Sequence, residues 1–251
     1  MSVLAVEELA KSWGGVRAVD GVSFAVSEGE MLALIGPNGA GKSTCFNMIG
    51  GQLRPDRGRV LLAGANVTGA PPRRLSRLGV GRTFQITETF ASMTVRENVQ
   101  AALLSHRRRI WRFGRPLAGQ AVEAAEELLD QVGLAEQAAR AAGVLAYGDL
   151  KRLELAMALA NAPRLLLMDE PTAGMAPAER TALMALVRQL ATTQRLAVLF
   201  TEHDMDVVFG IADRILVLNR GQLIAEGDAA AIRADARVRD VYLGGELSVP
   251  C

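Results

Sequence analysis

A glycine-rich stretch that also holds a lysine and two hydroxyl residues, residues 36–44, carries the clearest chemical signal in the chain. It reads GPNGAGKST and matches the pattern G-x-x-x-x-G-K-[ST], in which glycines let successive backbone N–H groups face one bound anion. In this pattern the lysine reaches the β- and γ-phosphates of a nucleotide, and the hydroxyl beside it binds Mg²⁺. The predicted phosphate-binding residues are Gly36, Pro37, Asn38, Gly39, Ala40, Gly41, Lys42, Ser43 and Thr44, with Ser43 also as a metal ligand.

Two acidic residues later in the chain have the chemistry and the position needed for hydrolysis. Residues 165–170 read LLLMDE, and acidic groups at the end of a buried strand are well placed to serve a phosphate site at a neighbouring strand end. Asp169 is predicted to hold Mg²⁺, directly or through water, and Glu170 to polarise the water that attacks the γ-phosphate. Acidic residues also end many ordinary strands, and the preceding phosphate-binding motif is what favours catalysis here.

The elements around these motifs predict an α/β core. Residues 31–35 are expected to form a buried strand, and residues 43–49 the start of a helix whose free N–H groups point into the phosphate loop. This strand-to-helix context disfavours the plainer interpretation of residues 36–44 as a glycine-rich turn with an exposed lysine. Two further buried parallel strands are predicted at 165–168 and 196–201, with a helix between them at 177–190. A closing hairpin is predicted at 215–225.

Two further regions are predicted to surround this core. Residues 3–9 and 22–26, separated by a turn-rich stretch at 11–20, are expected to form an antiparallel flank, and residues 59–63 are expected to form another strand. From residue 71 to about 160 the pattern becomes mostly helical, so we expect an inserted helical lobe. One of its helices buries the face that holds Val122, Ala125, Leu128, Leu129 and Val132, and it ends at Gly133. We expect the whole of 1–251 to be one domain, with flank and core at about 1–70 and 161–251.

Composition excludes several classes. Half of the 251 residues are hydrophobic, which is enough for a substantial core, and a formal charge of +1 gives no support to nucleic-acid binding. No apolar run reaches the length of a membrane span, and the N-terminus lacks a signal-peptide pattern, so we expect a cytosolic protein. Cys45 and Cys251 are too few and too far apart for a disulfide framework or a metal site.

The order of the motifs resembles one family, the nucleotide-binding subunits of ABC transporters, over nearly the whole chain. The resemblance implies that Trp13 stacks on adenine and that Gln85, in GRTFQ, binds Mg²⁺ or the attacking water. It implies that His203 contacts the γ-phosphate. Ala146 and Gly148, in the signature loop at residues 145–149, would face ATP on a partner subunit.

Each of these residues also has a structural interpretation, and their order along the chain is what favours the functional one. Trp13 could be a surface-packed aromatic residue, Gln85 a polar loop residue and His203 a structural histidine. No N-K-x-D run of the kind found in GTPases is present. A basic cluster with aromatic residues at 106–115 is expected to be a solvated face, with contact to anionic headgroups as the alternative.

The chain departs from the family pattern in the signature loop. That loop commonly reads L-S-G-G-Q, and here Ala146, Tyr147 and Asp149 replace three of its residues. Asp149 would repel a polyphosphate unless it turns away to cap a helix begun at Leu150. Ala176 stands where the family often has an aspartate. We therefore expect the site completed by this signature loop to be the weaker one of a pair.

Three stretches resemble the ATP-binding subunits of branched-chain amino acid importers: GRTFQ, LAYG, and the ending at 241–246. The resemblance implies a head-to-tail dimer with a second ATPase subunit, two membrane permease subunits and, indirectly, a solute-binding protein, at the cytoplasmic face of the cell membrane. Importers of urea or short amides share much of this pattern and remain an alternative. So do a soluble ABC ATPase outside transport and a scaffold subunit that does not hydrolyse ATP.

Overall fold

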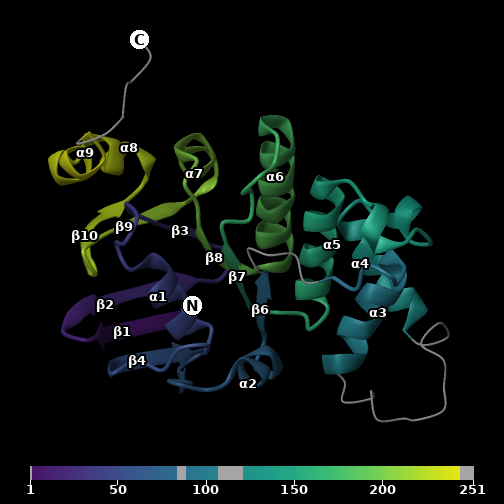
Figure 1. The fold of residues 1–251 in the computed structure, drawn as a ribbon, viewed down its shortest axis with the longest axis horizontal. Helices are drawn as coiled ribbons and strands as arrows, with labels where there is room; N and C mark the ends of the chain where they lie inside the picture. The colour runs from purple at the N-terminus through teal and green to yellow at the C-terminus, as the bar shows by residue number, and fades with distance from the viewer. Residues whose placement is uncertain (1, 84–88, 107–120, 244–251) are drawn as a thin grey trace.

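A six-stranded sheet forms the centre of the molecule (Figure 1). The computed structural model describes residues 2–83, 89–106 and 121–243. The strands lie in the order β10-β9-β3-β8-β7-β6, and all neighbours are parallel except the β9–β10 hairpin. Their bounds are β3 Met31–Ile35, β6 Val80–Thr83, β7 Leu165–Asp169, β8 Ala197–Thr201, β9 Arg214–Asn219 and β10 Gln222–Gly227.

The strands β3, β7 and β8 are apolar because both of their faces are covered. Every residue of β3 and β8 is buried, as expected for central parallel strands. Met31, Ala33 and Ile35 belong to one hydrophobic core, whereas Leu32 and Leu34 belong to a second core on the opposite face. Successive side chains of β3 therefore point to opposite faces of the sheet and contribute to a different core on each face.

A second, antiparallel sheet carries the first part of the chain (Figure 1). Its order is β2-β1-β4-β5, with β1 at Ser2–Trp13, β2 at Val16–Ser27, β4 at Arg57–Leu62 and β5 at Ala65–Asn66. The predicted antiparallel flank is confirmed, but the turn-rich stretch expected at 11–20 is wrong. Only Gly14 and Gly15 form the turn, both with positive φ, and the two strands continue on either side of it.

Helices cover the central sheet and form a separate group at one end, on the right of Figure 1, where α3, α4 and α5 pack together. In α4 the predicted apolar face is confirmed, since Ala125 and Leu129 are buried and Gly133 follows with positive φ. The helices are α1 Lys42–Ile49, α2 Pro72–Arg77, α3 Val95–His106, α4 Val122–Gln131, α5 Tyr147–Leu159, α6 Pro177–Gln194, α7 Met205–Ile211, α8 Ala229–Ala234 and α9 Ala236–Leu243.

The structure differs from the sequence predictions at several boundaries. The strand β6 lies within the stretch that we expected to be mostly helical, and it pairs with β7 at the edge of the central sheet. Its four residues are too few for a periodic signal, and pairing with β7 decides their conformation. The helix α1 begins at Lys42 rather than Ser43, and α6 extends beyond residue 190 to Gln194.

Candidate functional site

The predicted phosphate loop, residues 36–44, connects β3 to α1. Gly36, Gly39 and Gly41 all have positive φ, at 152°, 78° and 103°, which is the conformational freedom that the sequence motif requires. A Cβ on Gly36 would lie 2.2 Å from the carbonyl oxygen of Leu218, and a Cβ on Gly41 would lie 2.2 Å from that of Ala18. The loop is therefore held against β9 and β2, with the N-terminus of α1 facing it.

Lys42 is folded over this loop. Its Nζ donates to the carbonyl oxygens of Gly36, at 2.6 Å, and Pro37, at 3.0 Å. Burial lowers the pKa of the Lys42 ammonium, and the nearby charges of Asp169 and Glu170 oppose that effect. The tertiary fold therefore brings the lysine of the first motif close to both carboxylates of the second, as a nucleotide site requires.

Asp169 ends β7 and is oriented by the neighbouring strand. Its Oδ1 accepts a 2.7 Å hydrogen bond from Thr201 Oγ1 on β8, and its Oδ2 lies 4.0 Å from Arg82 Nη2. The Arg82 guanidinium also donates to Asn47 Oδ1 of α1 at 2.9 Å. Burial lowers the pKa of Arg82, opposed by the charge of Asp169. The carboxylate predicted to serve the metal is thus held by groups from β8 and β6.

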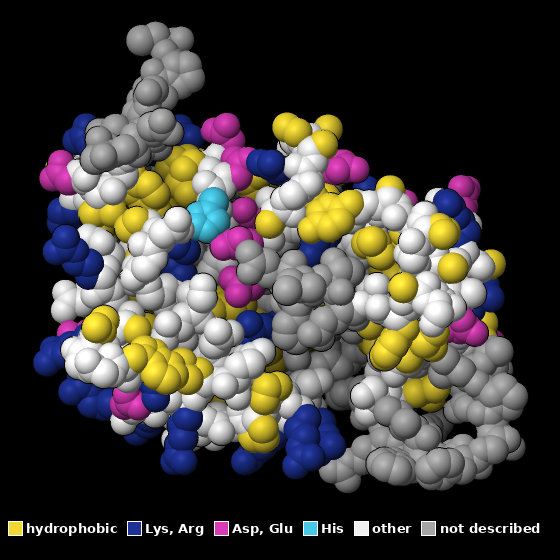
Figure 2. Space-filling model, in the orientation of Figure 1, with side chains coloured by type: hydrophobic (Ala, Val, Ile, Leu, Met, Phe, Trp, Pro, Cys, Tyr) yellow, Lys and Arg dark blue, Asp and Glu magenta, His cyan; other side chains and the backbone are white. Residues whose placement is uncertain are grey.

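Glu170 and His203 meet across the ends of β7 and β8. Glu170 Oε1 lies 2.9 Å from His203 Nε2, and Figure 2 shows a histidine beside acidic side chains, in the upper left part of the face drawn. The His203 side chain is 51% exposed and that of Glu170 is 22% exposed, so a ligand can reach both. Glu170 has a left-handed backbone, with φ of 48°, and its N–H donates to Thr201 Oγ1 at 3.0 Å.

Trp13 lies at the end of β1, beside the turn to β2. It is 53% exposed, and the Lys11 Nζ lies 4.9 Å from the centre of its ring. Lys11 in turn donates to Asp56 Oδ1 at 2.6 Å. The indole therefore presents an open surface while a cation contacts its ring, and its predicted role in stacking on adenine stays a prediction.

The signature loop leads into α5. The structure places Ala146 at the N-cap, with Gly148 and Asp149 inside the first turn. The expectation that the helix begins at Leu150 is therefore wrong, because the backbone is already helical from Tyr147. Asp149 is not the capping residue, and a carboxylate in the first turn is instead stabilised by the helix dipole.

Two predictions fall outside the described residues. Gln85 lies there, and so does the basic cluster from Arg107 onward. Arg82, Thr201 and Glu202 contact residues of the predicted site and were not predicted from the sequence. A signal for two of them exists in the chain, since Thr201 and Glu202 are polar residues at the end of an apolar run and directly precede His203.

Comparison with known proteins agrees with this geometry. A family model described as ABC transporter matches residues 19–173, and one described as Branched-chain amino acid ATP-binding cassette transporter matches residues 222–247. The chain is 40% identical to the high-affinity branched-chain amino acid transport ATP-binding protein BraF of Pseudomonas aeruginosa, covering 96% of this chain and 98% of BraF. It is 39% identical to LivG of Escherichia coli, with the same coverage of both chains.

Solved structures give the same result. The ADP conformation of MJ1267, an ATP-binding cassette of an ABC transporter, is 34% identical, with a TM-score of 0.87 over 98% of this chain and 100% of that chain. The chain therefore belongs to the ABC transporter family. Within that family it is the ATP-binding cassette, an ABC-type ATPase, because the relatives that carry this description match it over nearly its full length.

Proposed function

We propose that this chain hydrolyses ATP to power an ABC importer of branched-chain amino acids. The observation that carries the ATPase mechanism is the 2.9 Å contact between Glu170 Oε1 and His203 Nε2, at strand ends beside the phosphate loop. The solute class is supported by the match of residues 222–247 to the branched-chain amino acid model and by the names of BraF and LivG.

The residues present fit a nucleotide with Mg²⁺. Gly36 and Gly41 allow close backbone approach, and the free N–H groups at the start of α1 favour phosphate. In our proposal Ser43, Asp169 and Gln85 hold Mg²⁺, which neutralises charge on the phosphate oxygens when bound. Lys42 exchanges its carbonyl partners for phosphate oxygens, and Trp13 stacks on the adenine ring.

Glu170 is the proposed general base. It accepts a proton from the water that attacks the γ-phosphate. The His203 imidazole contacts this carboxylate through Nε2, and in our proposal it donates its N–H to the γ-phosphate when ATP is bound. In a head-to-tail dimer with a second ATPase subunit, Ala146 and Gly148 would face the nucleotide bound by the partner. Hydrolysis would then reopen the dimer and drive the conformational change.

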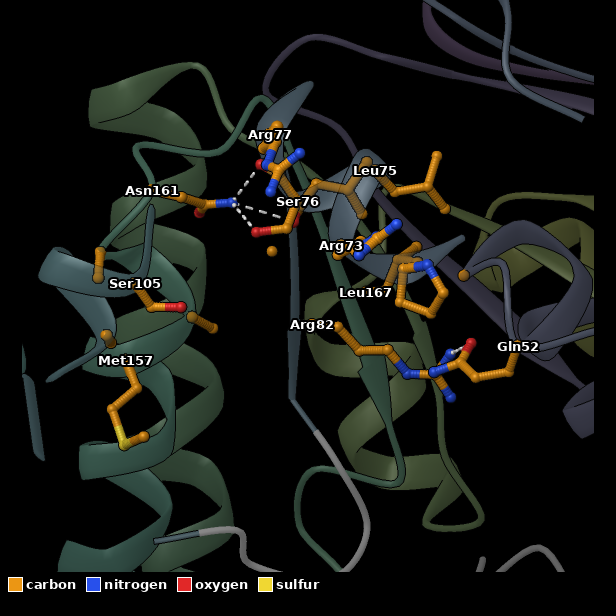
Figure 3. Close-up of a pocket in the computed structure, with 17 residues that line it drawn as sticks. Gln52, Arg73, Leu75, Ser76, Arg77, Arg82, Ser105, Met157, Asn161 and Leu167 are labelled. Carbon is orange, nitrogen blue, oxygen red and sulfur yellow. Dashed lines mark hydrogen bonds between the residues drawn. The ribbon is translucent and has the colours of Figure 1, made fainter. Parts of the chain in front are cut away.

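A cleft beside β6 is our proposed docking site for a membrane permease subunit. Its volume is about 660 Å³, and it lies between α2 and β6 on one side and α3 and α5 on the other (Figure 3). Arg73 and Arg77 line it together with Arg82. These charges favour an acidic segment on the permease.

Docking at this cleft would place the chain at the cytoplasmic face of the cell membrane as a peripheral subunit. Among the residues that the structure describes, no helix combines the length and the apolar character needed to span a bilayer. In our proposal the two permease subunits hold the chain at the membrane, and they in turn receive solute from a binding protein.

The test is isolation of the native complex with this chain as bait, in gentle detergent and with ATP present. Recovery of a second ATPase subunit and two permeases would support the importer. Recovery of ribosomal or nucleic-acid partners without a permease would overturn it. Uptake of labelled leucine, compared with labelled urea, then tests the solute: loss of leucine uptake alone on Glu170→Gln replacement is expected, and loss of urea uptake alone would reject the amino-acid assignment.

A further inference from the structure

Glu202 is a buried carboxylate between β8 and α7 that the mechanism above does not use. Its exposed fraction is 4%. Oε1 accepts hydrogen bonds from the Thr172 N–H, at 2.9 Å, and from Thr172 Oγ1, at 2.7 Å. Oε2 accepts from the backbone N–H of His203 at 3.1 Å. Since burying a carboxylate is costly unless donors surround it, these contacts are the reason that the side chain is accommodated here.

These contacts connect the two segments that carry the proposed catalytic pair, Glu170 and His203. Thr172 lies two residues after Glu170, on the loop that follows β7, and His203 directly follows Glu202. Glu170 and His203 are joined to each other at 2.9 Å. Glu202 therefore links the loop that carries the proposed base to the segment that carries the histidine, in addition to their direct contact.

The backbone of Glu170 gives a reason for such a tie. Its φ of 48° is uncommon for a residue with a side chain and costs about 1–2 kcal/mol. Strained conformations of this kind persist only where surrounding contacts fix them. Thr201 Oγ1 accepts a hydrogen bond from the Glu170 N–H, and Glu202 accepts two from Thr172. Two consecutive residues of one segment therefore hold both the strained residue and the loop that follows it.

We infer that Glu202 is a positioning residue, which sets the separation and orientation of Glu170 and His203 for ATP hydrolysis. This inference rests on the proposed function of those two residues. It assigns a role in the chemical step to a side chain with no direct access to the nucleotide, and it predicts a specific kinetic effect rather than a general loss of stability.

The test compares Glu202→Gln with wild type in the complex isolated through this chain. The amide oxygen can still accept hydrogen bonds from Thr172. The amide nitrogen then faces the backbone N–H of His203, and because both groups are donors, that hydrogen bond is lost. We expect kcat to fall by roughly 10- to 100-fold, in line with the cost of a small misplacement of catalytic groups, with KM for ATP and binding of a fluorescent ATP analogue changed less than about 3-fold. An unchanged kcat, or a loss confined to binding and melting temperature, would overturn the inference.

Thr172 supplies a second and milder test, which also decides the matter if Glu202→Gln fails to fold. Thr172→Val removes the hydroxyl bond and keeps the shape, whereas Thr172→Ser keeps the hydroxyl. We expect a smaller loss of kcat in Thr172→Val and near wild-type kcat in Thr172→Ser. The double variant with Glu202→Gln should lose less than the product of the two single losses, because both act through one contact. Equal kcat in Val and Ser variants would contradict the inference.

A matched control and the wild type separate this inference from the function on which it rests. Glu127→Gln replaces an exposed carboxylate on α4 and should leave kcat unchanged. If the wild-type complex fails to hydrolyse ATP at all, the proposed function is wrong. If wild type hydrolyses ATP and Glu202→Gln does so equally well, the proposed function stands and the positioning role is rejected.

Discussion

The hydroxyl of Tyr147, in the first turn of α5, donates a 3.1 Å hydrogen bond to the carbonyl oxygen of Ala173, on the loop after β7. The tyrosine ring also lies beside Gly174, where an added Cβ would contact it at 3.5 Å. A residue of the signature loop is therefore joined to the loop that follows the proposed base in the same chain. A movement of α5 should therefore displace that loop.

Replacing Tyr147 with phenylalanine tests this connection. The ring contact stays and one exposed hydrogen bond is lost, so the free energy of unfolding should fall by no more than about 1 kcal/mol. Because the two loops are then less firmly coupled, we expect a moderate decrease in ATP turnover, measured with purified complex. Tyr147→Ala removes the ring as well and should lower turnover further. Equal turnover in both variants and wild type would show that the connection is structural.

Glu170→Gln should keep ATP binding and abolish turnover. The amide has the shape of the carboxylate and cannot accept the proton of the attacking water, so we expect kcat to fall by ~10² to 10⁴. Binding of a fluorescent ATP analogue and phosphate release are the two measurements. Wild-type phosphate release in this variant would remove Glu170 from the role of base, and Glu127→Gln on α4 is again the matched control.

The two inner glycines of the phosphate loop should differ in their tolerance of a side chain. Gly39 has φ of 78° and no heavy atom of the described residues within 4 Å of an added Cβ, so Gly39→Ala should cost about 1–2 kcal/mol. An added Cβ on Gly41 would also lie 2.2 Å from a backbone oxygen of Ala18. Gly41→Ala should therefore cost about 2–5 kcal/mol. Denaturant unfolding without nucleotide measures both, and similar losses would contradict the structure.

Cys45 should be chemically inert in the folded chain. It is fully buried in α1, and burial raises the pKa of its thiol to about 12. Because the thiolate is the reactive form, alkylation at pH 8 should modify this residue only after unfolding in denaturant. The measurement is mass spectrometry of a Cys251→Ser variant, so that no second thiol contributes. Rapid labelling of the native protein would show that this part of α1 opens readily.

Reversing two charges of the proposed permease cleft should weaken assembly. Arg73→Glu combined with Arg77→Glu places acidic groups on α2, where we propose that an acidic permease segment docks. We expect the permeases to be lost from the isolated complex while ATP binding stays unchanged. The control is Arg239→Glu on α9, which lies at the upper left of Figure 1, away from α2. Retention of the permeases in the double variant would move their docking site elsewhere.

Local sequence was sufficient for the motifs and for most central strands. The phosphate loop is defined by glycines, a lysine and hydroxyl groups in consecutive positions, and the runs at 31–35 and 165–168 are apolar because both faces of such strands are covered. These features depend on neighbours in the chain, so their pattern is visible without a fold. The short strand β6 has no such pattern, since its conformation depends on pairing with β7.

Only the tertiary structure decided which residues surround the reacting groups. The order of the central sheet places β8 between β3 and β7, so that His203 meets Glu170 and Thr201 meets Asp169, although more than thirty positions separate each pair. Spacing along the chain does not specify which parallel strands become neighbours, because the connecting segments allow several orders. The motifs could thus be found one by one, whereas the bonds of Arg82, Thr201 and Glu202 that hold them in place required the fold.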